Sequence, residues 1–237
     1  KALDIALGGF AVGEGRMKRV FQGAMVALVT PFKDGRVDEA KVRELVEYQI
    51  KNGTDVLVPC GTTGESPTLS HHEHKRVIEL TVEAANKRVP VVAGTGSNST
   101  AEAIELTRYA KQVGADGALL VLPYYNKPTQ QGLIAHCRAV ADAAELPLIL
   151  YNIPGRTGIN MLPETLAALA DHPYIVGMKE ATGNLERAAE LRRVVPEGWN
   201  LLSGDDPTLL PFFAVGGDGA ISVLSNIAPR QVIEVWE

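Results

Sequence analysis

Short runs of β-branched and aliphatic residues alternate along this chain with longer segments in which apolar residues recur every three or four positions. The short runs are typical of buried strands, and the longer segments are typical of amphipathic helices. The alternation repeats eight times from Ala24 onward, and repeated strand–helix units form a parallel sheet covered by helices. The predicted strands are residues 24–30, 55–60, 90–95, 117–123, 147–152, 175–179, 200–204 and 219–223.

The predicted helices lie between residue types that commonly begin or end helices. Examples of the amphipathic segments are EAKVRELVEYQIKN (39–52), HEHKRVIELTVEAANK (72–87) and AEAIELTRYAKQVG (101–114). The expected N-terminal caps are Asp38, Ser70, Thr100 and Thr129, and the expected stops are Gly53, Pro90, Gly114 and Pro147.

Eight parallel strands can form either a closed (β/α)8 barrel or an open doubly wound sheet. No G-x-G-x-x-G fingerprint follows the first strand, and the strand–helix units are evenly spaced along the chain. We therefore predict an α/β protein with a (β/α)8 TIM barrel. A chain of 237 residues can form such a barrel as one domain, which we expect over residues 17–237.

The two ends of the sequence depart from this repeating pattern. Residues 1–16 precede Met17 and are interpreted as an N-terminal extension. The last helical segment, residues 229–237, has barely two turns, whereas the eighth helix of a barrel is normally longer. We expect the barrel to be cut within or after its eighth helix, which would expose apolar surface on that side.

Composition and charge narrow the functional classes. The formal net charge is −5, and acidic and basic residues are intermixed, so no nucleic-acid partner is expected. Cys60 and Cys137 are far apart and form no C-x-x-C pair, which favours a reducing, cytoplasmic compartment. No apolar run is long enough to span a bilayer, so no membrane association is expected.

Lys179 is the most informative polar residue, because active sites of (β/α)8 barrels lie at the C-terminal ends of the strands. It follows the apolar run Ile175 to Met178, which places an ammonium where a strand enters the barrel interior. Desolvation there lowers the pKa of the amine and supplies the neutral form that attacks a carbonyl. The alternative is a structural ion pair with Glu180 or with a nearby aspartate.

Three other features near the expected barrel mouth suit a carbonyl reaction on an acidic substrate. Tyr151 ends an adjacent strand and could move a proton, although a core tyrosine is the alternative. The loop GTTGE (61–65) offers hydroxyls and backbone N–H groups at the start of a helix, which suits a small carboxylate. Arg156 offers a second carboxylate site or is an ordinary surface residue.

The histidine-rich segment from His71 to His74 raises the alternative of a zinc-dependent aldolase. These residues open a helix after Ser70, where polar side chains commonly act as caps, and no other histidine ends a strand. We therefore predict no metal site.

With these residues in view, the chain resembles the dihydrodipicolinate synthases, in the family that includes N-acetylneuraminate lyase and related pyruvate aldolases. The resemblance runs from about Phe21 to the end. Its motifs are GTTGES (61–66), AGTGSN (93–98), PYYNKP (123–128), YNIPGRTG (151–158), GMKEATGN (177–184) and LLSGDD (201–206).

The resemblance implies a role for each matching residue. Lys179 would form a Schiff base with pyruvate, without any other cofactor, and Tyr151 would relay a proton together with Thr62 and Tyr125. Tyr125 would reach the site of a neighbouring subunit, which implies a homodimer or homotetramer. Substrate would be bound by Thr63, Arg156, Gly204, Asp205 and Ile221. Six further positions match an allosteric lysine site: Ser66, His71, His74, Asn98, Glu102 and Tyr124.

The reaction implied is a lyase-type aldol condensation of pyruvate with L-aspartate 4-semialdehyde. It gives 4-hydroxy-tetrahydrodipicolinate in the biosynthesis of diaminopimelate and lysine. Arg156 favours this reaction over that of sialic-acid-type lyases, which generally lack the arginine. Two alternatives stay open: a sibling pyruvate aldolase acting on another aldehyde, and an inactive truncated barrel scaffold.

Overall fold

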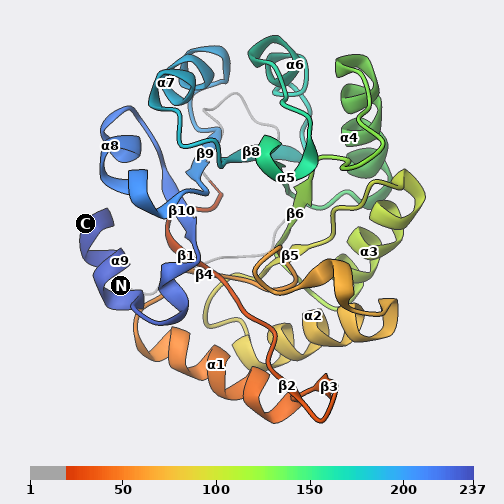
Figure 1. The fold of residues 1–237 in the computed structure, drawn as a ribbon, viewed down its shortest axis with the longest axis vertical. Coiled ribbons are helices and arrows are strands. Elements are labelled where there is room, and N and C mark those ends of the chain that lie inside the picture. The colour runs from red at the N-terminus through yellow and green to blue at the C-terminus, as the bar shows by residue number, and fades with distance from the viewer. Residues whose placement is uncertain (1–19) are drawn as a thin grey trace.

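The computed structural model describes residues 20–237, and these form a (β/α)8 barrel, as predicted (Figure 1). Each predicted strand run overlaps one strand of the parallel sheet. The strands are β1 (Gly23–Ala27), β4 (Val56–Val58), β5 (Val92–Gly94), β6 (Gly117–Val121), β7 (Leu148–Asn152), β8 (Ile175–Glu180), β9 (Asn200–Ser203) and β10 (Gly219–Ser222).

The sheet closes on itself between β4 and β5. Leu57 N donates to the carbonyl of Pro90 at 3.0 Å, and Gly94 N donates to the carbonyl of Pro59 at 2.8 Å. All other neighbours in the ring are paired in parallel, and β1 lies between β4 and β10. The prediction of a closed barrel in place of an open doubly wound sheet is therefore confirmed.

Helices surround the barrel, with a short hairpin of β2 (Phe32–Lys33) and β3 (Arg36–Val37) after the first strand (Figure 1). The helices are α1 (Glu39–Lys51), α2 (His71–Ala85), α3 (Thr100–Gln112), α4 (Gln130–Ala144), α5 (Pro154–Thr157), α6 (Pro163–Ala167), α7 (Leu185–Val194), α8 (Leu209–Ala214) and α9 (Pro229–Trp236). Short 3-10 turns are η1 (Ser66–Thr68), η2 (Asp206–Thr208) and η3 (Leu224–Asn226).

Three of the four predicted helix caps are confirmed. The side chains of Asp38, Ser70 and Thr129 each accept a backbone N–H from the first turn of α1, α2 and α4. Thr100 is wrong as a cap, because it is the first helical residue of α3. Ser99 occupies the cap position, where its hydroxyl accepts from the N–H of Glu102.

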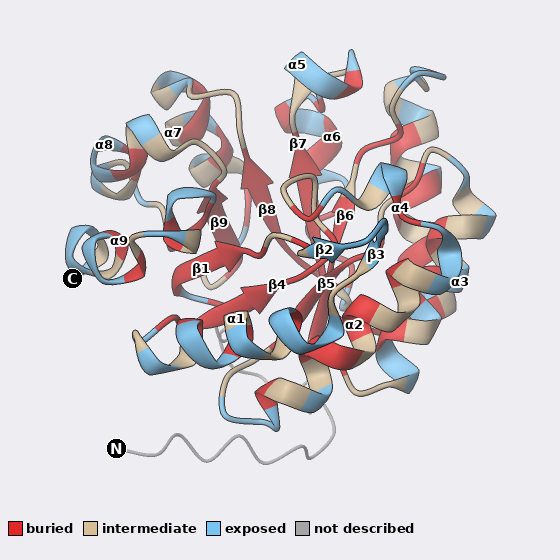
Figure 2. Cartoon of the chain, turned by 60° about the horizontal axis from the view of Figure 1, so that its bottom comes forward, coloured by how far each residue is buried: buried red, intermediate tan, exposed pale blue. Residues whose placement is uncertain are grey.

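The core has two layers, one inside the barrel and one between the strands and the helices (Figure 2). Successive strand residues point to opposite faces of the sheet, so each strand contributes to both layers. The inner layer comprises Phe21, Met25, Ala27, Val56, Val58, Val92, Leu119, Ile149, Tyr151, Val176, Leu202 and Ile221.

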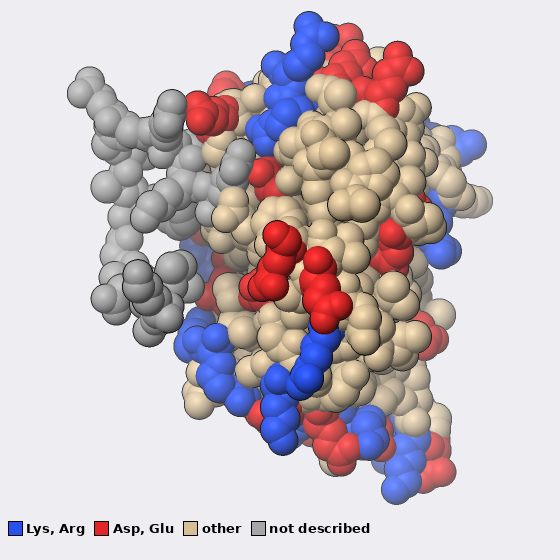
Figure 3. Space-filling model, turned by 90° about the vertical axis from the view of Figure 1, so that its left-hand side faces the viewer, with Lys and Arg blue, Asp and Glu red and all other residues tan. Residues whose placement is uncertain are grey.

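The N-terminal extension proposed for residues 1–16 lies outside the described residues. The last helix, α9, is short, as its sequence indicates. Figure 3 shows the side of the molecule that carries α8 and α9, where much of the surface is uncharged. Exposed large hydrophobic side chains on these elements and around η3 are Leu210, Val223, Leu224, Ile227 and Val235. Within residues 20–237, no helix combines the length and apolarity that a bilayer crossing requires.

Candidate active site

An extra residue in β8 determines which way Lys179 points. Leu148 pairs with Ile175 but Ile149 pairs with Gly177, so Val176 has no partner in β7. Val176 packs into the inner layer and Met178 into the outer layer. A bulge of this kind re-aims every side chain that follows it. Lys179 therefore points into the barrel mouth, opposite Tyr151, with which it pairs in register.

The Lys179 side chain lies in an apolar, desolvated position. The residue is only 5% exposed, and burial lowers the pKa of its amine from 10.5 to about 8, opposed by the negative charge of Asp206. At pH 7 roughly one amine in ten is then neutral, against about one in 3000 for an unperturbed lysine. The site thus raises the concentration of nucleophile by roughly 300-fold.

The absence of a side chain at Gly204 makes room for Lys179. A Cβ built on Gly204 would lie 2.6 Å from Lys179 Cε and 2.7 Å from Ala181 Cβ. Gly204 N donates to the carbonyl of Glu180 at 2.8 Å, which fixes this close approach. Gly204 therefore packs against the Lys179 side chain, and its part in a substrate pocket stays a prediction.

Tyr151 completes the centre of the site. The Lys179 Nζ lies 4.3 Å from the centroid of the Tyr151 ring. Burial raises the pKa of the Tyr151 phenol, while a side-chain hydrogen bond with Thr62 and the positive charge of Arg156 oppose this rise. The structure thus brings Tyr151, Thr62 and Arg156 into one electrostatic environment. A phenol in this position stays protonated at neutral pH and can both donate and accept a proton.

The GTTGE loop lies beside this centre, between β4 and η1. Cys60 has φ 55°, a conformation that is uncommon for a non-glycine residue, and the Thr30 hydroxyl donates to the carbonyl of Gly64 at 2.7 Å. Within the described residues, the backbone N–H groups of Thr62 and Thr63 have no hydrogen-bond acceptor. One part of the prediction is wrong: the loop leads into the three-residue turn η1, and α2 begins only at His71.

The predicted Asp205 and Ile221 lie at neighbouring strand ends, after β9 and in β10. The carboxylate of Asp205 accepts from the Thr208 hydroxyl at 2.8 Å, and Ile221 is buried in the inner layer. Sequence reasoning missed Asp206, whose carboxylate accepts from the backbone N–H groups of Val223 and Leu224 at 3.1 and 2.9 Å. Its charge acts on Lys179, and only the three-dimensional fold reveals this.

Tyr125 is the one predicted relay residue that the structure leaves apart from the others. Its side chain is 89% exposed, and its φ of 69° is uncommon for a bulky residue. Within a single chain, Tyr125 therefore lies on the surface.

The residues of the predicted lysine site form linked pairs on one flank of the barrel. His71 pairs with Glu102, and the electrostatic influence of both reaches His74. The Asn98 side chain donates to the carbonyl of Tyr124 at 3.2 Å. Ser66, in η1, has no side-chain contact that links it to the other members of the group. Lysine binding by this group stays a prediction.

The histidine-rich segment is engaged in ordinary structural contacts. The His74 ring contacts the carbonyl of Gly94 at 2.7 Å, and burial lowers the pKa of His74. In the part of the chain from residue 20 onward, no three histidine, cysteine, aspartate or glutamate side chains gather as a metal site would require.

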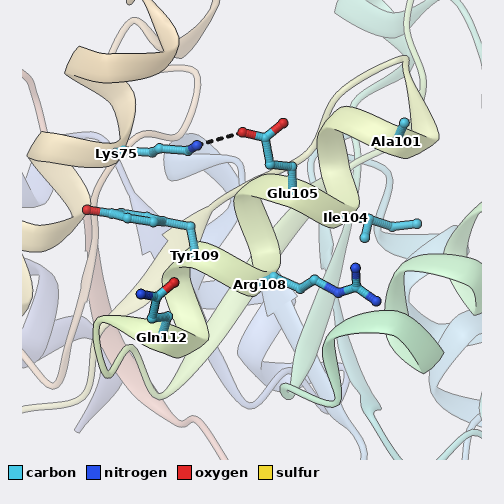
Figure 4. Close-up of a pocket in the computed structure, with 7 residues that line it drawn as sticks. All are labelled: Lys75, Ala101, Ile104, Glu105, Arg108, Tyr109 and Gln112. Atoms are coloured by element: carbon cyan, nitrogen blue, oxygen red, sulfur yellow. Dashed lines mark hydrogen bonds and ion pairs between the residues drawn. The ribbon is translucent and has the colours of Figure 1, made fainter.

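A hollow of about 330 Å³ lies on the outer surface around α3 (Figure 4). Lys75 of α2 pairs there with Glu105 of α3 at 2.6 Å and lies 5.4 Å from the ring centroid of Tyr109. The residues that line it are Lys75, Ala101, Ile104, Glu105, Arg108, Tyr109 and Gln112. All belong to helices, so this hollow is separate from the strand ends that carry the chemistry.

The structural alternative for Lys179 fails. The carboxylate of Glu180 points to the opposite face of the sheet and pairs with Arg187 at 3.0 Å. Among the ion pairs of residues 20–237, none includes Lys179. A buried lysine without an ion-pair partner, next to a phenol, is the arrangement expected of a Schiff-base nucleophile.

Comparison with known proteins shows which family the chain belongs to. A sequence model of the dihydrodipicolinate synthetase family matches residues 20–237. The 4-hydroxy-tetrahydrodipicolinate synthase of Citrifermentans bemidjiense is 64% identical over 213 residues, which are 90% of this chain and 73% of the relative.

Two solved structures are also similar. Dihydrodipicolinate synthase from Aquifex aeolicus superposes with a TM-score of 0.89 at 51% identity, covering 90% of this chain and 73% of the other. The chloride-inhibited dihydrodipicolinate synthase from Acinetobacter baumannii, solved in complex with pyruvate, gives a TM-score of 0.89 at 53% identity. The match covers 91% of this chain and 75% of that enzyme.

Proposed function

Because this chain belongs to the dihydrodipicolinate synthetase family, we propose that Lys179 is the nucleophile of a Schiff-base aldol reaction that joins pyruvate to L-aspartate 4-semialdehyde. The enzyme is a lyase of the pyruvate-dependent aldolase type. Its product is 4-hydroxy-tetrahydrodipicolinate, in the biosynthesis of diaminopimelate and lysine. The observation that carries the assignment is the buried Lys179 amine, of lowered pKa, 4.3 Å from the Tyr151 ring.

The chemistry begins with attack of the neutral Lys179 amine on the keto carbon of pyruvate. The resulting carbinolamine loses its hydroxyl as water, and Tyr151 supplies the proton that this step needs. Loss of a proton from the methyl carbon gives an enamine, with the imine nitrogen as electron sink. The enamine carbon then attacks the aldehyde, and the aldehyde oxygen takes up a proton. The amino group of the condensed semialdehyde finally attacks the imine carbon and displaces the Lys179 amine, which closes the ring of the product and frees the enzyme. No cofactor is required beyond the covalent bond to pyruvate itself.

We assign the remaining site residues by charge and position. Thr63, with its unpaired backbone N–H, would hold the pyruvate carboxylate. The exposed guanidinium of Arg156, whose charge reaches Tyr151, would hold the carboxylate of the aldehyde. Gly204, Asp205 and Ile221 would shape the pocket around the growing product.

Tyr125 is proposed to act across a subunit interface, as the third member of the relay with Thr62 and Tyr151. Its 89% exposure in a single chain supports this, because an isolated surface tyrosine has no access to the site. The functional unit would then be a homodimer or a homotetramer. If the protein has the mass of a monomer in solution and still condenses pyruvate with L-aspartate 4-semialdehyde at its full rate, the proposal is ruled out.

We also propose that the enzyme works in the cytoplasm. Cys60 and Cys137 are buried and free, which suits a reducing compartment.

The group of Ser66, His71, His74, Asn98, Glu102 and Tyr124 is the proposed place for feedback by lysine. Inhibition that is absent at about millimolar lysine, a concentration at which weak sites fill, would exclude it.

The experiment that tests the function is a condensation assay with a Lys179→Ala control. We expect consumption of L-aspartate 4-semialdehyde in the presence of pyruvate, and no consumption by the variant. Faster turnover of a sugar-acid aldehyde would point to a sibling pyruvate aldolase. A Lys179→Ala chain that condensed the substrates at the unmodified rate would refute the proposed nucleophile.

A further inference from the structure

A buried group of polar side chains lies on the outer face of the barrel wall, directly opposite the catalytic pair. Tyr151 pairs with Lys179 across β7 and β8, and the next residues, Asn152 and Glu180, pair with each other. Because successive side chains point to opposite faces of a sheet, Asn152 and Glu180 point outward where Tyr151 and Lys179 point inward. Any movement of the strand backbone at the outer pair therefore moves the inner pair.

The carboxylate of Glu180 is the centre of this outer group. Its Oε2 accepts from Arg187 Nε and from Asn152 Nδ2, both at 3.0 Å, and its Oε1 accepts from the backbone N–H of Thr182 at 2.9 Å. Arg187 Nη2 in turn donates to the carbonyl of Met161 at 2.6 Å, and Asn152 Oδ1 accepts from Met161 N at 3.1 Å. The group thus joins β7, β8, α7 and the loop before α6, and Figure 2 labels these elements.

Burial of this group is nearly complete. Asn152, Glu180 and Arg187 are 0%, 2% and 9% exposed. A buried ion pair seldom stabilises a protein more than apolar side chains of the same size would, because both charges lose their hydration. A fully hydrogen-bonded buried network does, however, specify one arrangement of the elements that it joins. Its contribution is therefore to geometry more than to stability.

The network bears on the register of β8 against β7 after the bulge. Val176 is the extra residue, so the register of β8 against β7 differs on the two sides of it. A shift of one residue would turn Lys179 to the outer face and bring Met178 inward, because side chains alternate along a strand. The hydrogen bond between Asn152 and Glu180 joins the two strands immediately after the catalytic pair, where it opposes such a shift.

We propose that Glu180, Arg187 and Asn152 are positioning residues, which hold β8 in the register that points Lys179 at Tyr151. This rests on the proposed function of Lys179. None of the three lies on the inner face. Asn152 and Glu180 act on the reaction through the strand backbones that they share with the catalytic pair, and Arg187 acts from α7 through its hydrogen bond with Glu180. Their loss slows imine formation without changing how pyruvate is held by the GTTGE loop of another strand.

The test uses the variant Glu180→Gln/Arg187→Met, in which both charges are removed together. The single change Glu180→Gln leaves Arg187 buried without its partner and is prone to misfolding, whereas the double change avoids an unpaired charge. Full-length protein is mixed with pyruvate and quenched with borohydride at successive times. The adduct on Lys179 is then quantified by peptide mass spectrometry, which gives both a rate and a final labelled fraction.

A matched control removes a second ion pair of the same helix at the other end of the barrel. Arg192 of α7 pairs with Asp218 at 3.0 Å and donates to the carbonyl of Trp199, and Asp218 and Trp199 precede β10 and β9. The control is Arg192→Met/Asp218→Asn. Both double variants lose one ion pair of α7, so both can lower the stability of the protein. The melting temperature of each variant measures this loss of stability separately from the labelling rate.

We expect Glu180→Gln/Arg187→Met to label all chains but about 100-fold more slowly, because β8 then holds the register that points Lys179 at Tyr151 for only about 1% of the time. The pyruvate concentration for the half-maximal rate stays the same, and the control labels at about the parent rate. An unchanged rate in the site variant, an equal loss in the control, or a lower labelled fraction at the parent rate would each overturn the inference. A parent chain that forms no adduct is a separate result, because it removes the proposed function and the inference with it.

Discussion

Replacement of Lys179 by methionine should stabilise the protein, and by an amount that depends on pH. Lys179 is 5% exposed, and its pKa is lowered by burial from 10.5 to about 8. A shift of this size corresponds to about 3 kcal/mol of unfavourable free energy for the charged amine in the folded state. Methionine has a similar length and no charge, so Lys179→Met removes this cost.

The pH dependence has a definite sign. Below about pH 8 the amine is charged in both states and the folded protein carries the full cost of about 3 kcal/mol. Between about pH 8 and 10.5 the unfolded chain binds more protons at Lys179 than the folded chain, so the stability of the unsubstituted protein rises with pH. By pH 10 the cost should fall below about 1 kcal/mol.

The assay is urea unfolding of both proteins at about pH 7 and about pH 10. We expect the stability advantage of Lys179→Met to shrink by about 2 to 3 kcal/mol between these conditions. Differences in packing between lysine and methionine are present at both pH values and cancel in this comparison. Lys111→Met, at an exposed lysine on α3, controls for the loss of a surface charge. If the stability advantage of Lys179→Met does not change with pH, the lowering of the Lys179 pKa by burial is refuted.

Three further predictions concern the same site. Gly204→Ala places a Cβ 2.6 Å from Lys179 Cε, so imine formation should slow by about 100-fold in borohydride trapping; an unchanged rate would contradict the close packing. Asp206→Asn removes a negative charge that raises the Lys179 pKa, so the midpoint of the pH profile of trapping should move to lower pH, and an upward shift would be inconsistent with this. Arg156→Gln should raise KM for L-aspartate 4-semialdehyde by about tenfold or more in steady-state assays; an effect on pyruvate alone would argue against the assigned role.

The barrel and the position of the proposed catalytic lysine follow from sequence because both depend on local patterns. Buried parallel strands are short apolar runs, and the residue at which each run stops lies at the barrel mouth by the topology of the fold. Lys179 and Tyr151 are such residues, and the structure pairs them directly. The caps Ser70 and Thr129 also follow from local rules, whereas Thr100 fails because the adjacent Ser99 occupies the cap position.

The orientation of Lys179 does not follow from alternation alone. With Val176 in the inner layer, strict alternation would place Met178 inside and Lys179 outside. The unpaired Val176 reverses this, and it depends on the pairing of β8 with β7. The roles of Asp206 and Arg187 were missed for the same reason, since their partners lie in other elements and no local pattern marks them.

The most direct test of the account is the intact mass of the protein after incubation with pyruvate and borohydride, followed by peptide mapping. We expect one reduced pyruvyl adduct per chain, located on Lys179, with the yield rising as the pH approaches the lowered pKa of about 8. An adduct on another lysine, or none at any pH, would contradict the assignment of Lys179 as the Schiff-base nucleophile.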